Sequence, residues 1–170
     1  MRYRRAFVPG GSFFFTLVTA GRKPILQSEQ TIATLREAFR RVRSKRPFTI
    51  DAIVILPDPL HCIWTLPPGD SDFSTRWRLV KTWFAKHCDD SPCPETGREV
   101  WQHRFWEHSL RDDTDVIRHV EYIHYNPVKH GYVTTPCHWP YSSFHRFVRD
   151  GLYPADWGAS GMDSEGIGRE

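Results

Sequence analysis

The chain has 170 residues, which is enough to bury a hydrophobic core without disulfides or metals, and this length predicts one domain. Hydrophobic residues make up 39% of the sequence and charged residues 25%, which excludes a disordered chain and a small disulfide scaffold. No apolar run is long enough to cross a bilayer, and the basic start, Met1–Arg5, leads into Pro-Gly-Gly rather than an apolar signal sequence. We therefore expect a cytoplasmic protein without a membrane partner.

Charge is distributed unevenly along the chain. The formal net charge is only +3, but residues 150–170 hold five acidic residues and one basic residue, so the rest of the chain is more basic than this value suggests. Together with 14% aromatic residues, the basic body is compatible with a nucleic-acid partner and equally with a solvated basic surface. We expect one domain over residues 1–150, followed by an acidic, flexible tail over residues 151–170 that competes with DNA for the basic face.

The first half of the chain predicts three strands and two helices. Residues 12–20 are rich in aromatic and β-branched types, as are residues 48–56 and 60–66, and all three segments are expected to be strands. A helix should begin after Ser28 and run to about Lys45, with a strongly basic end. Ser74 can cap a second helix, which should end near His87, with Arg76 directed outward.

The second half predicts one strand and two helices. After a polar loop over residues 88–99, residues 104–111 should form a fourth strand. A third helix should start at Asp112 or Asp113 and stop near Asn126, because Pro127 follows. A short helix is expected over residues 141–149. This element order fits an α+β, ferredoxin-like sandwich, in which helices cover one face of an antiparallel sheet of four or five strands and leave the other face available.

The third helix carries the most informative pattern. At about 100° per residue, five side chains share the sector that should face the core: Val116, Ile117, Val120, Ile123 and His124. Tyr122 and Asn126 lie four positions apart on roughly the opposite side, where their side chains are neighbours. This pair suits a functional site, but a surface tyrosine and an asparagine that ends the helix are the more ordinary explanation of the spacing.

Two histidine and cysteine patterns suggest metal chemistry. His61 lies on a predicted strand, but position 59, which shares its face, is a proline and offers no ligand atom. Cys88 and Cys93, with His87 and His103, allow a zinc-stapled interaction module, although their spacing is loose for such a site. The default interpretation of these cysteines is reduced thiols.

Four ordered motifs resemble those of the REP-associated tyrosine transposases, the single-tyrosine members of the HUH (His-hydrophobic-His) nuclease class. The motifs are Val54–Pro57 with His61–Pro67, Asp72–Arg78, Trp101–His108 and Tyr122–Gly131. The resemblance extends over nearly the whole chain, from Tyr3-Arg4-Arg5 to Asp156-Trp157. It implies an HUH core that binds single-stranded DNA carrying REP (repetitive extragenic palindromic) hairpins and that cuts and rejoins the DNA beside them. It also implies a nucleoid-associated protein, and we expect a monomer.

The resemblance also implies roles for particular residues. Tyr122 matches the family's nucleophile, which forms a 5′-phosphotyrosine, whereas His61 and Asn126 match ligands of a divalent ion, Mg²⁺ or Mn²⁺. The first histidine of the HUH pair should stand at position 59, where this chain has Pro59. Three interpretations follow: cleavage is weakened while hairpin binding is retained, Asp58 or a water replaces the ligand, or the DNA phosphate makes weak metal binding sufficient. We favour the first, which leaves open a non-catalytic hairpin-binding protein.

Basic side chains are the candidates for DNA contact. They lie at the N-terminus, at the end of the first helix, on the second helix and beside the fourth strand, where phosphate contacts would make binding dependent on salt. These residues are Arg2, Arg4, Arg5, Arg40, Arg41, Arg43, Lys45, Arg76, Arg78, Lys81 and Arg104.

Overall fold

A computed structural model describes residues 8–89 and 100–161. Its sheet consists of β1 (Ser12–Leu17), β2 (Thr49–Ile55), β3 (Leu60–Thr65) and β4 (Trp106–Ser109). The strands are ordered β2-β3-β1-β4, and every neighbouring pair is antiparallel. The fold class predicted from the sequence, an α+β protein with a four-stranded antiparallel sheet, is therefore confirmed.

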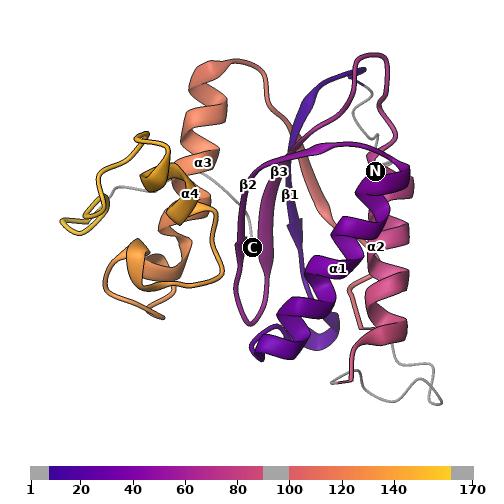
Figure 1. Ribbon diagram of the computed structural model, residues 1–170, viewed down its shortest axis with the longest axis horizontal. Helices are drawn as coiled ribbons and strands as arrows, with labels where there is room; N and C mark the ends of the chain where they lie inside the picture. Colours follow the sequence, from indigo (N-terminus) through magenta and orange to yellow (C-terminus); the bar gives the residue numbers. More distant parts are fainter. Residues whose placement is uncertain (1–7, 90–99, 162–170) are drawn as a thin grey trace.

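The helices lie on both sides of this sheet (Figure 1). Helices α1 (Glu29–Lys45) and α2 (Phe73–His87) pack against each other over one face, and α3 (Asp113–Lys129) packs against β2 and β3 on the other. The described part of the chain also has three short elements: η1 (Ala20–Arg22), η3 (Pro136–His138) and α4 (Phe144–Arg149). The expectation that the second face is left available is wrong, because α3 covers part of it.

Strand alternation divides the core between the two faces. On β1, Phe13 and Phe15 join the core under α1 and α2, whereas Phe14 joins the smaller core under α3. The same alternation on β3 places Trp64 in the first core and Ile63 in the second. Polar residues of β1 and β3 that share the face of Phe14 consequently point toward α3.

Helix boundaries follow from capping residues. Ser28 caps α1 as predicted, since its Oγ accepts a hydrogen bond from the Thr31 N–H at 3.1 Å. Helix α2 is capped by Asp72, two residues before the predicted Ser74, through a 3.0 Å bond from the Thr75 N–H. Helix α3 begins after Asp112 as predicted, but it continues through Pro127 to Lys129. The proline removes one backbone donor in the last turn, where the remaining bonds still hold the helix.

The packed structure continues past the predicted domain boundary at residue 150. Tyr153 stacks on Trp157, with ring centroids 4.5 Å apart, and both contact Phe144 of α4. The end of the acidic tail, residues 162–170, lies outside the described residues. Among the residues that are described, we find no helix with the length and apolar character needed to cross a membrane.

Candidate active site

The histidine of β3 is oriented by the neighbouring strand. His61 is fully buried and stands opposite Thr16 of β1 in the strand register. The Thr16 hydroxyl lies 2.8 Å from His61 Nδ1, a contact that fixes the plane of the imidazole. Metal-binding histidines are usually held in this way through the ring nitrogen that does not face the ion.

Helix α3 brings Tyr122 to this histidine. The two rings meet edge to face, with centroids 5.4 Å apart, and Phe14 of β1 lies 6.0 Å from the tyrosine ring. Tyr122 is only 2% exposed. The expectation that Tyr122 and Asn126 lie away from the core is therefore wrong, and so is the prediction that Ile117 faces it, since Ile117 is 56% exposed.

Asn126 lies one turn beyond Tyr122 and is fully buried. Its side-chain Oδ1 and Nδ2 atoms both lack a hydrogen-bond partner among the described residues. An unsatisfied buried amide is costly, and one at a functional site points to a ligand or ion that would satisfy it. The carbonyl oxygen of Asn126 thus fits a role as a metal ligand.

A cation lies over the candidate nucleophile. The Nζ atom of Lys129, two helical turns after Tyr122, is 4.9 Å from the centroid of the tyrosine ring. A cation over an aromatic face interacts favourably with the ring, and more strongly with a ring that carries a negative charge. Lys129 is solvent-exposed, so this charge borders the outer edge of the site.

Position 59, where the family pattern has its first histidine, is occupied by Pro59, which offers no ligand atom. Pro59 precedes β3, and the adjacent Asp58 directs its carboxylate to the end of β1, where it accepts a 2.9 Å hydrogen bond from the Thr19 N–H. Arg22 approaches the same carboxylate at 4.0 Å. Asp58 therefore anchors a loop, and these contacts argue against its replacing an imidazole at the metal site.

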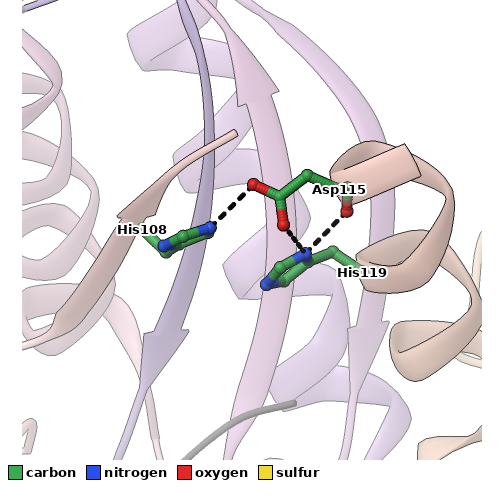
Figure 2. A group of neighbouring side chains, drawn as sticks. All are labelled: His108, Asp115 and His119. Carbon is green, nitrogen blue, oxygen red and sulfur yellow. Dashed lines mark hydrogen bonds and ion pairs between the residues drawn. The ribbon is translucent and has the colours of Figure 1, made fainter. Parts of the chain in front are cut away.

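A second cluster on α3 was not anticipated from the sequence (Figure 2). His108 of β4 and His119 of α3 flank the carboxylate of Asp115, with His108 Nε2 2.9 Å from Oδ2 and His119 Nδ1 3.4 Å from Oδ1. Burial raises the pKa of Asp115, but hydrogen bonds from His108 and Arg111 outweigh it and hold the pKa at about 2. Burial lowers the pKa of His119, which favours its neutral form. The i, i+4 spacing of Asp115 and His119 is visible in the sequence, but nothing there shows that β4 adds His108.

The candidate DNA-contact residues differ in their surroundings. Arg76 is 2% exposed, which corrects the expectation that it points outward: its guanidinium donates to both carboxylate oxygens of Asp70, at 3.0 and 2.6 Å. Arg43 donates to the Phe48 carbonyl, and Lys81 to the Gln102 carbonyl. Arg78 and Arg104 are exposed, whereas Arg2, Arg4 and Arg5 lie outside the described residues.

A basic groove runs between α1 and α2. It has a volume of about 480 Å³, and its lining includes Arg40, Arg41, Lys45, Trp83 and Lys86. Arg41 lies 5.2 Å from the Trp83 ring centroid, and both Arg40 and Arg41 also pair with Glu37. Helices α1 and α2, which line this groove, and helix α3, which carries Tyr122, lie on opposite faces of the sheet (Figure 1).

The zinc alternative receives no support from the described residues. Cys88 is buried at the C-terminal cap of α2, and His87 stacks on Trp83, with ring centroids 4.0 Å apart. Cys93 lies outside the described residues. Within residues 8–89 and 100–161, the group of at least three His, Cys, Asp or Glu side chains close enough to share a metal consists of His108, Asp115 and His119, and includes none of the residues of the zinc alternative.

Comparison with known proteins decides the family. A REP-associated tyrosine transposase of Escherichia coli K12 is 47% identical over 161 residues, which cover 95% of this chain and 93% of that protein. This chain belongs to the REP-associated tyrosine transposases. A relative from Haemophilus influenzae with the same family name is 41% identical, over 93% of each chain. No family model matches the sequence.

The fold agrees with a solved structure of the family. A REP-associated tyrosine transposase bound to a REP hairpin superposes with a TM-score of 0.82 and 42% identity, over 100% of this chain and 99% of that one. This chain therefore shares both the sequence and the fold of the REP-associated tyrosine transposases. Membership makes it a tyrosine transposase.

Proposed function

We propose that this transposase binds single-stranded DNA carrying REP-type hairpins, and that Tyr122 is its nucleophile. The observation that carries the proposal is the edge-to-face contact of Tyr122 with His61, together with the buried, unpartnered amide of Asn126 one turn away. The related structure bound to a REP hairpin supports the same substrate class.

The chemistry assigns each step to named atoms. Tyr122 Oη attacks the phosphorus of a DNA phosphodiester, the bond to the 3′ oxygen breaks, and a 5′-phosphotyrosine and a 3′-OH result. Because the new ester keeps the energy of the broken bond, the 3′-OH of another strand can reverse the step and rejoin the DNA. Lys129, whose ammonium group lies over the Tyr122 ring, would counter negative charge on the phenolate and the phosphate.

His61 and Asn126 are the side chains that would hold Mg²⁺ or Mn²⁺. When bound, such an ion polarises the scissile phosphate and stabilises the leaving oxygen. Pro59 removes one of the two imidazoles of the family pattern, and Asp58 is engaged with Thr19. We therefore propose that cleavage is weakened in this chain, whereas hairpin binding is retained.

Several basic surfaces would contact the DNA backbone. The groove between α1 and α2 combines Arg40, Arg41 and Lys45 with the indole of Trp83, which suits phosphate contacts next to an aromatic surface. Arg43, Arg78, Lys81 and Arg104, with the N-terminal arginines, would extend the contact. Arg76 is not among the proposed DNA contacts, because its guanidinium is buried and paired with the Asp70 carboxylate.

A nicking assay tests the catalytic part. Purified protein is incubated with a labelled single-stranded REP hairpin and Mn²⁺, and the covalent adduct is measured after denaturation. We expect hairpin binding with little adduct, a clear gain of adduct in Pro59→His, and no adduct in Pro59→His combined with Tyr122→Phe. Efficient adduct formation by the unmodified chain would refute weakened cleavage, and adduct in the Tyr122→Phe variant would refute the nucleophile.

The second candidate function is hairpin binding without catalysis, which the loss of the ligand at Pro59 favours. The same assay separates the two functions. A Pro59→His variant that binds hairpins normally but still forms no adduct would support a binding module. Failure of both proteins to bind a hairpin would overturn the proposed substrate class.

A further inference from the structure

The cluster of His108, Asp115 and His119 has no part in the proposed reaction. We propose that it is a second metal site, for a divalent transition-metal ion such as Zn²⁺ or Co²⁺. It is separate from the ion that His61 and Asn126 would hold. One ligand atom from each of its three side chains lies within 4.8 Å of the others. Two imidazoles with one carboxylate suit transition metals, whereas Mg²⁺ prefers oxygen ligands.

The three side chains come from two elements, α3 and β4, and face one another (Figure 2). Asp115 and His119 lie one turn apart on α3, and His108 reaches the same carboxylate from β4. Each carboxylate oxygen faces a different imidazole nitrogen, at 2.9 and 3.4 Å. An ion would enter between groups that already face one another.

Besides the hydrogen bond that His108 Nε2 donates to Asp115 Oδ2, whose proton would move to Nδ1, two contacts would have to give way to the ion. Arg111 Nε lies 3.3 Å from Asp115 Oδ2, but the arginine side chain is 76% exposed and can move into solvent. His119 Nδ1 lies 2.7 Å from the Asp115 carbonyl, to which it donates in the absence of metal. Binding through Nδ1 moves the imidazole proton to Nε2 without a net loss of protons from the ring. Neither change requires movement of the backbone.

The cluster lies on the same side of α3 as Tyr122 and Asn126, nearer the start of the helix. At about 100° per residue, Asp115, His119, Tyr122 and Asn126 fall within roughly 60° of one another around α3. Phe14 contacts both groups, with ring centroids 5.8 Å from His61 and 4.9 Å from His119. A bound ion would therefore join β4 to the stripe of α3 that carries Tyr122, and would hold that stripe against the sheet.

Metal binding to the full chain tests this site without any measurement of activity. Metal-free protein is titrated with Co²⁺ and followed by visible absorption, and its melting temperature is measured with and without Zn²⁺. We expect a Co²⁺ site that is kept when His61 is replaced, and a rise in melting temperature with Zn²⁺. Asp115→Asn and His108→Gln should both weaken Co²⁺ binding at least about tenfold and remove the Zn²⁺ effect.

Matched variants identify the site. Asp113→Asn alters an exposed carboxylate two residues before Asp115 and should bind Co²⁺ like the unmodified chain. His61→Gln and Cys88→Ser should also keep this site, because they affect only the family site and the zinc alternative. If Asp115→Asn weakens the helix start, His108→Gln on β4 still decides the question. Unchanged Co²⁺ binding in His108→Gln, or no effect of Zn²⁺ on the unmodified chain, would show that the cluster is only a hydrogen-bonded network.

Discussion

Substitution of Arg76 should destabilise the fold rather than weaken DNA contact directly. The guanidinium is 2% exposed and makes five hydrogen bonds, two of them to the Asp70 carboxylate and the others to the carbonyls of Arg46, Pro47 and Asp72. Breaking a buried ion pair costs about 3–5 kcal/mol. The Asp70 side chain is 33% exposed and can be rehydrated, so we expect the lower end of that range, about 3 kcal/mol, for Arg76→Ala.

Urea unfolding of the full chain measures this effect, with Arg78→Ala as the matched control. Arg78 is exposed on the same helix, and its substitution should change the free energy of unfolding by less than about 0.5 kcal/mol. In Arg76→Ala the melting temperature should fall by roughly 6–12 °C, while the folded fraction keeps its hairpin affinity. A variant of normal stability that loses hairpin affinity would refute the structural role and restore Arg76 as a DNA contact.

Three further predictions follow from the same contacts. The hydrogen bond from Arg76 lowers the pKa of Asp70, so the ionised Asp70 should stabilise the fold above about pH 4 and lose this contribution at lower pH. Asp70→Asn should therefore reduce the change in urea midpoint between pH 5 and pH 3. Lys45→Glu combined with Lys86→Glu should weaken hairpin binding and flatten its dependence on salt. Lys23→Glu, outside the groove, should change both less, and equal effects would exclude the groove as a DNA-binding surface. Asn126→Leu should preserve or raise the melting temperature, because it removes an unsatisfied buried amide. In the Pro59→His background it should also abolish the Mn²⁺-dependent adduct. A destabilised Asn126→Leu protein would argue that the amide has a structural partner.

The strands and the first two helices could be predicted because each buries one well-marked face. Ile32, Leu35 and Phe39 recur at helical spacing in α1, and all three are buried under the sheet. The aromatic run of β1 was equally clear, although alternate rings enter different cores. Patterns of this kind are local, so one sequence is enough to show them.

Helix α3 was harder to predict because it is buried over a wider arc than its apolar residues mark. Its buried face includes Asp115, His119, Tyr122, His124 and Asn126, and of these Asp115 and His119 meet His108 of β4. His124, which was predicted to face the core, lies 2.8 Å from Ser143 Oγ, whereas His119, which was not, stacks on His108. A rule based on hydrophobic spacing places such residues on the surface, since their partners are distant in the sequence.

The burial of Arg76 could not be predicted for a related reason. Arginine at an N-terminal turn of an amphipathic helix ordinarily points into solvent, and nothing in the spacing indicates otherwise. Its partners at residues 46, 47 and 70 come from the ends of α1 and α2, which only the packed helix pair brings together. Long-range polar contacts of this kind separate a structural arginine from a DNA-binding one.

The effect of Pro59 should remain local to one ligand position. The second imidazole is still fixed by Thr16, the amide of Asn126 is still buried without a partner, and Tyr122 still meets His61 at 5.4 Å. A site that had lost its function would not be expected to keep a costly unsatisfied amide beside an oriented histidine. The arrangement therefore favours a site lacking a single ligand over a degraded one, which is why one substitution, Pro59→His, should be sufficient to increase cleavage.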